Sequence, residues 1–233
     1  MAALAGKHVL ITSGPTRADL DAVRYISNRS TGRLGCRIAL EALGRGAKVT
    51  LIAGHQSAVP AQDKLPEDER TRLRIVHIET VADLIETLEP ELTAAQPPDA
   101  VVHAMAVLDY VPEAAGAEKT PSGRDSCEVR LVRTPKVIRR IKDWAPDTYL
   151  VEFKLEFGRP EEQLREMALA SLRASRADLV VANDLERIRD ESHPALIIAP
   201  DGAVLARPAT KSQIARELCD LLAEALASPD GAP

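Results

Sequence analysis

The residues of this chain best suited to chemistry lie between Leu10 and Gly35, in the segment LITSGPTRADLDAVRYISNRSTGRLG. An apolar stretch enters a long polar loop, and Gly32 and Gly35 then open a segment with helical periodicity. A helix N-terminus offers free amides and a partial positive charge, and glycines there allow an anion to approach closely. Guanidinium groups in the loop could hold phosphate or carboxylate through paired hydrogen bonds. Three arginines occur there: Arg17, Arg24 and Arg29.

Short polar residues surround these glycines, which favours a phosphate-binding concavity. They are Ser13, Gly14, Thr16, Asn28, Ser30 and Thr31. The spacing is not the dinucleotide pattern G-x-G-x-x-G, and no lysine follows as in a P-loop. Packing of a helix against a sheet also selects glycine, so both explanations stay open for the glycines taken alone. If a nucleotide binds here, the spacing indicates a manner of binding other than that of NAD.

A second candidate segment reads HAMAVLDYVP, at the end of an apolar stretch. Ala104 and Ala106 are small enough for a ligand to approach the backbone. Asp109 either caps a turn or holds a Mg²⁺-phosphate or a ligand hydroxyl. His103, within the apolar stretch, is expected to be a core histidine.

Three further candidate residues have two explanations each from the residues alone. Lys119 lies in an aperiodic, polar segment, where a lysine is usually solvated. Asn183 and Asp184 end the segment ADLVVAND and could bind a ligand or cap the following turn.

The elements of the first half alternate between strands and helices and predict a parallel sheet. The expected strands are 8–12, 48–54, 73–78 and 99–105, the expected helices are 34–43 and one that Thr80 caps, and 56–71 is expected to be an exposed loop. This order is typical of an α/β fold, a Rossmann-like doubly wound, mostly parallel sheet with helices on both faces. Ligands bind such sheets at the carboxyl ends of the strands, where both candidate loops fall.

The second half continues this pattern after a flap excursion. Residues 111–124 are rich in Gly, Pro, Ala and charge and have no periodicity. We expect strands at 127–132, 149–156 and 177–184 and a hairpin around Asp201 and Gly202. Helices are expected from Thr134–Pro135 to about Trp144 and over 160–174. The last helix is expected over 214–226, preceded by a capping box of Thr210 and Gln213. Residues 1–227 then form a single domain, and 228–233 a disordered tail.

Composition narrows the class of protein. The chain has 233 residues, 3% aromatics and a net charge of −5, which disfavours general nucleic-acid binding. Cys36, Cys127 and Cys219 are far apart and are expected to be small buried residues in a reducing, cytoplasmic location. We find no signal peptide and no apolar run long enough for a bilayer, so no membrane association is expected.

Taken together, these segments resemble phosphopantothenoylcysteine synthetase, also called phosphopantothenate–cysteine ligase. The similar blocks are ITSGPTRADLDAVRYISNRSTGRLG, HAMAVLDYVP, the lysine of AEKTPSG, RTPKVIRRIK, LVEFKLE and ADLVVANDL. They occur in the family's order and cover nearly the whole chain. HAMAVLDY and the TPK segment are most similar to the stand-alone bacterial form, so no flavin and no fused decarboxylase domain are expected.

The resemblance implies a two-step ligation in coenzyme A biosynthesis. The carboxylate of 4′-phosphopantothenate attacks the α-phosphate of CTP and releases pyrophosphate, and the amine of L-cysteine then attacks the acyl-cytidylate and releases CMP. Bacterial members typically use CTP and eukaryotic ones ATP, so the same ligase with ATP is the alternative. Mg²⁺ would accompany the triphosphate, and the resemblance implies a homodimer.

The resemblance also implies a role for each matching residue. Asn28, Lys119 and Asp109 would be catalytic. The nucleotide would contact Gly14, Ser30, Gly32, Gly35, Pro135, Lys136, Val137, Ile138, Phe153 and Asn183. The phosphopantothenate would contact Arg24, Asn28, Met105, Ala106 and Asp109, with Arg24 reaching the neighbouring subunit.

The chain departs from the family pattern in two places. Many bacterial members carry lysines on the helix before ADLVVAND, whereas this chain has Ser171 and Ala174 or Ser175 near those positions, with Arg173 and Arg176 close by. Met105 replaces an alanine that is frequent in the family.

Two functions of other classes compete with the ligase. A nucleotide-binding regulatory or scaffold protein of the same fold would have lost turnover, which the presence of Asn28, Asp109 and Lys119 argues against. An NAD(P)-dependent reductase is disfavoured by the glycine spacing.

Overall fold

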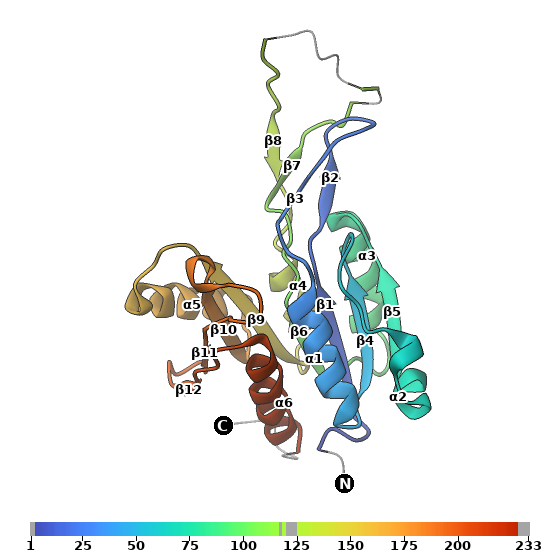
Figure 1. The fold of residues 1–233 in the computed structure, drawn as a ribbon, viewed down its shortest axis with the longest axis vertical. Coiled ribbons are helices and arrows are strands. Elements are labelled where there is room, and N and C mark those ends of the chain that lie inside the picture. Colours follow the sequence, from blue (N-terminus) through green and yellow to red (C-terminus); the bar gives the residue numbers. More distant parts are fainter. Residues whose placement is uncertain (1–2, 117, 120–124, 228–233) are drawn as a thin grey trace.

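A central sheet of eight strands runs through the protein in the order β12-β11-β10-β9-β6-β1-β4-β5 (Figure 1). The computed structural model describes residues 3–116, 118–119 and 125–227. Strands β5, β4, β1, β6, β9 and β10 are parallel to their neighbours, and β11 and β12 add an antiparallel edge. The bounds are β1 His8–Ser13, β4 Lys48–Ala53, β5 Leu73–His77, β6 Ala100–His103, β9 Tyr149–Glu156, β10 Leu179–Asp184, β11 Ala195–Ile198 and β12 Val204–Ala206.

Helices cover both faces of this sheet and create two apolar cores. Helices α1 and α6 lie on one face, and α3, α4 and α5 on the other, while the short α2 packs beside α1 and β5. Their bounds are α1 Arg33–Gly44, α2 Glu67–Arg72, α3 Val81–Leu92, α4 Val137–Trp144, α5 Glu161–Ser175 and α6 Lys211–Ala227. Successive residues of a strand point to opposite faces of the sheet, so each buried strand contributes side chains to both cores. The predicted Rossmann-like α/β fold is confirmed.

Two of the helix N-termini carry the capping residues that the sequence predicts. Thr80 caps α3 through a reciprocal capping box, accepting from the Asp83 amide at 3.1 Å while Asp83 accepts from the Thr80 amide at 2.9 Å. The expected box before α6 is only half formed. The Gln213 amide donates to Thr210 Oγ1 at 3.2 Å, but the Gln213 side chain accepts from the Ala209 amide instead.

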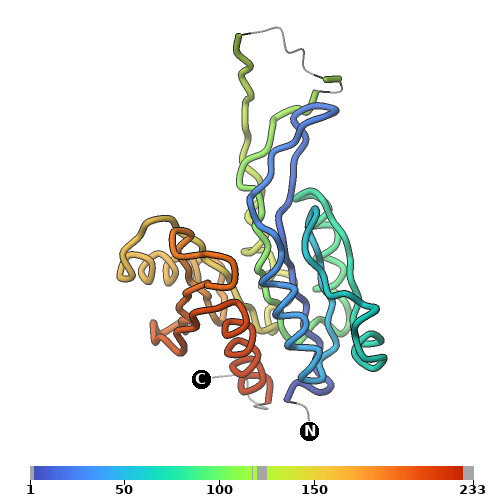
Figure 2. Tube along the Cα trace, viewed as in Figure 1, coloured from blue at the N-terminus to red at the C-terminus, as the bar shows by residue number. Residues whose placement is uncertain are grey.

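Two antiparallel ribbons project together from the body (Figures 1 and 2). The first arm is the hairpin of β2, Arg17–Asp19, and β3, Tyr25–Ser27. The second arm pairs β7, Tyr110–Pro112, with β8, Leu131–Arg133. Of the predicted flap 111–124, residues 117 and 120–124 lie outside the described residues. A hydrogen bond of 3.0 Å from the Gly116 amide to the Leu20 carbonyl joins the two arms.

Four predicted elements were wrong in extent. The segment after Thr12 is not simply a loop, because it contains the first arm. Residues 56–71 contain a 3₁₀ turn, Gln62–Lys64, and most of α2. The expected half-buried strand 127–132 shrinks to β8, whose side chains lie on a projecting ribbon. The helix expected to start with Pro135 begins at Val137, with Lys136 as its N-cap residue.

The three cysteines do not share one environment, which corrects the prediction that all are buried. Cys219 is buried in the α6 core, Cys36 is half-buried and Cys127 is exposed. No helix among the described residues is long and apolar enough to cross a bilayer. The predicted tail 228–233 lies outside the described residues, and the single domain over 1–227 stays a prediction.

Candidate active site

A cleft of about 1300 Å³ opens at the carboxyl ends of the central strands. It is bounded by the loop after β1, the loop after β6, the start of α4, and side chains of β9, α5 and β10. Of the predicted site residues, those that line it are Gly14, Asn28, Ser30, Gly32, Gly35, Met105, Ala106, Asp109, Pro135, Lys136, Val137, Ile138, Phe153 and Asn183. The fold thus brings most of the predicted residues to one cavity, as expected for a parallel sheet.

The N-terminus of α1 forms one wall and is built for close approach of an anion. Gly32 is its N-cap residue with φ of 71°, and Ser13 Oγ donates to the Gly32 carbonyl at 3.0 Å. A Cβ on Gly35 would lie 2.1 Å from Ser13 Oγ, so only glycine lets the helix end rest on β1. The free amides of this helix end therefore border the cleft without side chains in the way.

Asn28 joins the two candidate loops. Its side-chain amide donates to the Ala106 carbonyl at 3.0 Å, and the Thr16 amide donates to the same carbonyl at 3.2 Å. The Ala106 amide in turn donates to the Gly14 carbonyl at 2.8 Å. These hydrogen bonds hold the loop after β1 against the loop after β6, which lies about ninety residues later in the chain. Asn28 lies where the two loops meet and form one wall of the cleft.

Asp109 and Lys136 face each other across the mouth of the cleft. Lys136 Nζ lies 2.6 Å from Asp109 Oδ1, and both side chains are about half exposed. The Thr134 amide donates to the Asp109 carbonyl at 3.0 Å, which fixes the segment leading into α4 beside the second loop. Asp109 is therefore not simply a turn cap, because its carboxylate pairs with a cation and, among the described residues, accepts no hydrogen bond from a backbone amide.

Arg24 and Lys119 lie away from the cleft. Arg24, near the tip of the first arm, forms an ion pair with the buried carboxylate of Asp21. Lys119 is exposed in the described part of the second arm. Neither residue lines the cavity of this chain, so a role for them needs movement of the second arm or a neighbouring subunit.

Asn183 and Asp184, at the end of β10, have different structural roles. Asp184 accepts backbone hydrogen bonds from Gly158, Arg159 and Glu186 and so caps the neighbouring turns. Asn183 lines the cleft, and its Nδ2 lies 3.0 Å from Nε2 of the buried His193. Sequence reasoning missed His193, which comes from the segment after β10 and fixes the Asn183 amide.

A polar row crosses the sheet beneath the cleft. Thr12, His103 and Glu152 are register neighbours on β1, β6 and β9, and Thr12 Oγ1 lies 2.8 Å from His103 Nδ1. His103 is buried as expected for a core histidine, yet its ring also lines the cavity. Glu152 was missed, although an acidic residue in the middle of a buried strand is itself an unusual signal.

The model of the family described as DNA/pantothenate metabolism flavoprotein C-terminal domain matches residues 4–226. The chain belongs to this family.

Members of this DNA/pantothenate metabolism flavoprotein family with solved structures share the fold over their whole length. A structure from Streptococcus pneumoniae is 29% identical with a TM-score of 0.82, and covers 93% of this chain and 98% of its own. The C-terminal domain of a coenzyme A biosynthesis bifunctional protein CoaBC is 28% identical with a TM-score of 0.77, at 97% and 99% coverage.

A curated relative in the same family is the coenzyme A biosynthesis bifunctional protein CoaBC of Thermococcus kodakarensis. It is 38% identical over 217 residues, which are 93% of this chain and 51% of the relative. The chain thus spans about half the length of the curated relatives it matches.

The departure from the lysine pattern of family members falls inside the cleft. Ser171, Ala174 and Ser175 line it, whereas Arg173 and Arg176 do not. Arg176 ends α5 in a left-handed conformation and pairs with Asp143 of α4. Neither arginine therefore takes the place of a lysine in this cavity.

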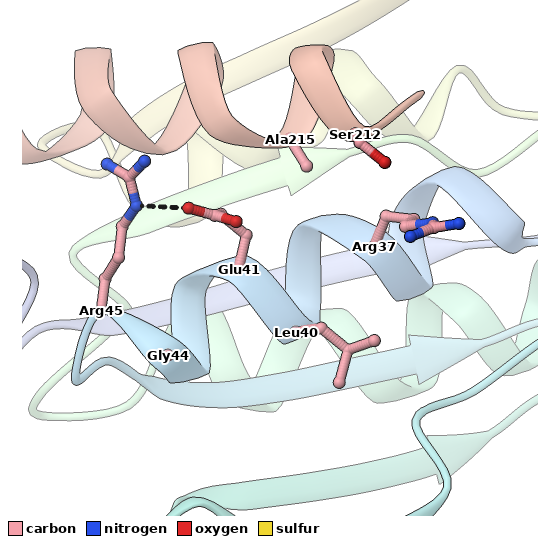
Figure 3. Close-up of a pocket in the computed structure, with 7 residues that line it drawn as sticks. All are labelled: Arg37, Leu40, Glu41, Gly44, Arg45, Ser212 and Ala215. Carbon is pink, nitrogen blue, oxygen red and sulfur yellow. Dashed lines mark hydrogen bonds and ion pairs between the residues drawn. The ribbon is translucent and has the colours of Figure 1, made fainter. Parts of the chain in front are cut away.

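A second, smaller hollow of about 400 Å³ lies between α1 and α6 (Figure 3). Arg45 crosses it, with its Nε 2.8 Å from Glu41 and its Nη1 2.5 Å from Asp220 of α6. The hollow contains no predicted site residue and is explained by the packing of these two helices. Among the described residues, no group of three or more His, Cys, Asp or Glu side chains is placed to hold a metal ion.

Acid should destabilise the protein through its two buried histidines. Burial lowers the pKa of His103 and of His193 to about 4 each, from an ordinary value of 6.5. The unfolded chain therefore binds more protons below pH 6.5, so stability is full above that pH and falls toward pH 4. We expect a loss of up to about 1.4 kcal/mol per pH unit for each histidine.

Denaturant unfolding at several pH values between 7.5 and 4 measures this effect. His103→Gln should show a flatter loss of unfolding free energy in that window, and the exposed His77→Gln should follow the wild type. Equal slopes for all three proteins would contradict the assignment.

Proposed function

We propose that this chain is a phosphopantothenate–cysteine ligase acting in coenzyme A biosynthesis. The observation that carries the proposal is the hydrogen bond of Asn28 to the Ala106 carbonyl, which joins a glycine-opened helix N-terminus to the second loop in one cleft. Family membership supports the same reading, since the family is described by pantothenate metabolism and its CoaBC relatives by coenzyme A biosynthesis.

The proposed reaction has two steps and CTP as the preferred triphosphate. In the first step a carboxylate oxygen of 4′-phosphopantothenate attacks the α-phosphorus, and pyrophosphate leaves. In the second, the cysteine nitrogen attacks the acyl carbon of the acyl-cytidylate, loses a proton, and CMP leaves. Both steps depend on positioning two anionic reactants and on neutralising charge, which amides and cations in one cleft supply.

The nucleotide would lie along the α1 end of the cleft. The amides near Gly32 and Gly35 would meet the phosphates, and Phe153, Asn183 and the segment 135–138 would border the nucleoside. Phosphopantothenate would then occupy the side of Met105, Ala106 and Asp109, with Asn28 between the two reactants. The larger Met105 side chain, 7% exposed, would narrow that side of the cavity.

Mg²⁺ would enter with the triphosphate. Mg²⁺ is commonly held by substrate phosphates, water and one or two carboxylates, and Asp109 offers one carboxylate at the mouth of the cleft. When bound, the ion would neutralise phosphate charge. The proposed chemistry does not use a flavin.

A homodimer is part of the proposal. Arg24 lies near the tip of an arm outside the cleft of its own chain, where it would reach the phosphate of phosphopantothenate in a neighbouring subunit. Exposed apolar side chains on the arms support contact with another copy: Val23, Tyr25, Tyr110, Val129 and Leu131. The expected cytoplasmic location stays a prediction.

Pyrophosphate release tests the function directly. We expect release only when phosphopantothenate and a triphosphate are both present, and faster release with CTP than with ATP. Faster release with ATP would replace CTP by ATP and keep the ligase. No release with any triphosphate would overturn the ligase and favour a nucleotide-binding regulatory protein of the same fold.

Lys119 is expected to act in the first step. We propose that the second arm closes over the cleft and brings this exposed amine to the developing phosphate charge. Lys119→Gln should therefore slow pyrophosphate release by about 10- to 100-fold, the loss of one charge-assisted interaction. The exposed Lys64→Gln is the matched control, and an unchanged rate in Lys119→Gln would remove this residue from the site.

A further inference from the structure

Glu152 is a buried carboxylate at the floor of the cleft. It lies on β9, its residue is 5% exposed, and it lines the cavity together with Ser171 and Ser175 of α5. Ser171 Oγ donates to Oε1 and Ser175 Oγ to Oε2, so each carboxylate oxygen is held by one hydroxyl. The two serines are four residues apart on one helix face, which aims both hydroxyls at the same group.

Among the residues that the structure describes, this carboxylate has no cationic partner. Within the part of the chain that the structure describes, no Lys, Arg or His nitrogen lies within 4.0 Å of it, and its polar contacts are the two hydroxyls. The nearby Lys154 is paired with Glu156 at 2.9 Å. A buried charge without a counter-charge is costly, and two neutral donors offset only part of that cost.

The position of Glu152 ties it to the proposed reaction centre. It is the register neighbour of His103, the last residue of β6, on the adjacent strand about 4.8 Å away. Three residues after His103 the chain reaches Ala106, whose carbonyl binds Asn28. Asn28, Ala106 and Glu152 therefore line one and the same cleft.

We propose that Glu152, held by Ser171 and Ser175, is the subsite for the primary ammonium group of the amine substrate. This rests on the proposed function, in which the three reactants are a triphosphate, phosphopantothenate and cysteine. The first two are anions that a carboxylate repels. The ammonium group of cysteine is the cation among these reactants, and each Glu152 oxygen keeps a lone pair for it beyond the serine bond.

The subsite would hold the amine substrate next to the acyl group before the second step. The bound ammonium group then releases one proton to solvent, the free amine attacks the acyl carbon, and the nitrogen loses its second proton as CMP leaves. An ammonium–carboxylate contact is a charge-assisted hydrogen bond, so its loss should weaken cysteine binding by about 10- to 100-fold. The first step should not need it, because no cation of the substrate takes part in forming the acyl-nucleotide.

Glu152→Gln tests the proposal in the full chain. We expect the KM for cysteine to rise at least about 10-fold, with pyrophosphate release from CTP and phosphopantothenate in the absence of cysteine unchanged. Hydroxylamine, which is uncharged at neutral pH, also attacks acyl-nucleotides and gives a hydroxamate. Its rate should be the same in the variant and the wild type, which a merely structural defect would not allow.

Two further variants support the comparison. Glu161→Gln removes an exposed carboxylate of α5 outside the cleft and should leave the KM for cysteine unchanged. Ser171→Lys places an ammonium group of the protein next to Glu152 at a half-buried helix position and should raise that KM even if Glu152→Gln does not fold. Thermal unfolding of each variant reports whether the fold is kept.

The outcomes separate the subsite from the ligase itself. An unchanged KM for cysteine, an equal loss with hydroxylamine, or a loss of pyrophosphate release in Glu152→Gln would overturn the ammonium subsite while the wild type remains a ligase. A wild type without substrate-dependent pyrophosphate release would overturn the proposed function and the subsite with it.

Discussion

In the proposed ligase, Asn28→Asp is expected to form the acyl-cytidylate but to convert it to amide about 100- to 1000-fold more slowly, so that the intermediate accumulates. The variant replaces the amide that donates to the Ala106 carbonyl at 3.0 Å by a group that cannot donate. It also adds a negative charge where the two anionic reactants are proposed to meet. Loss of one donor in such a preorganised site costs about this much in rate.

Rapid quench with labelled phosphopantothenate measures the intermediate, and single-turnover release of CMP measures its conversion. Gln62→Glu is the matched control, because it makes the same kind of amide-to-carboxylate change on an exposed 3₁₀ turn. Asn28→Ala separates the two causes, since it removes the donor without adding charge. Wild-type turnover in Asn28→Asp would show that the assigned role is wrong.

Gly35→Ala is expected to lose about 1–3 kcal/mol of stability and, in the proposed ligase, most of the CTP-dependent activity. The new Cβ would lie 2.1 Å from Ser13 Oγ and 2.4 Å from Ser13 Cβ. Either Ser13 or the first turn of α1 must shift, and the shift breaks the Ser13 hydroxyl bond to the Gly32 carbonyl. Overpacking in a closely packed region typically carries this cost.

A second-site change tests this reason. Ser13→Gly removes the clashing atoms, so the double variant Ser13→Gly, Gly35→Ala should regain stability and CTP binding relative to Gly35→Ala. Gly44→Ala in the last turn of α1 is the control, because nothing lies within 4 Å of its added Cβ. Denaturant unfolding and CTP titration measure both effects, and a double variant no better than Gly35→Ala would contradict the steric account.

The sequence predicted the wall around Asn28 because parallel strands bring the loops at their carboxyl ends together. The first loop and the second loop each follow a recognisable apolar strand, and these two strands are parallel neighbours. The predicted parallel sheet was therefore enough to predict that the two loops lie side by side. Phe153, which is proposed to border the nucleoside, came from the resemblance and not from spacing, whereas Asn183 was also a candidate because it ends a strand.

The floor of the cleft could not be predicted in the same way. Glu152 meets Ser171 and Ser175 across 19 and 23 residues of chain, through a helix packed on a sheet. Nothing local in the letters LVEFKLE fixes that packing, although a carboxylate at a buried position of the strand was a usable warning. The pairing of His193 with Asn183 was hidden for the same reason.

The first arm was also hidden, because its strands are only three residues long and carry no apolar alternation. Their pairing is fixed by the backbone and by anchors outside the arm. Ser27 Oγ donates to the Thr16 carbonyl at 2.9 Å, and Arg17 forms an ion pair with Glu79. A two-stranded ribbon is only marginally stable by itself, so contacts with the body of the protein are needed to hold it in place.

The first arm gives the proposed dimer a two-way connection. Asn28 follows β3 directly, and Arg24 precedes it, so one short extended stretch, about 13 Å long, has one end in its own cleft and the other near the arm's tip. Any displacement of Asn28 by substrate in one subunit would therefore shift the arginine offered to the other. Where such a shift alters the affinity of the opposite cleft, thermodynamic reciprocity requires the effect to be equal in both directions.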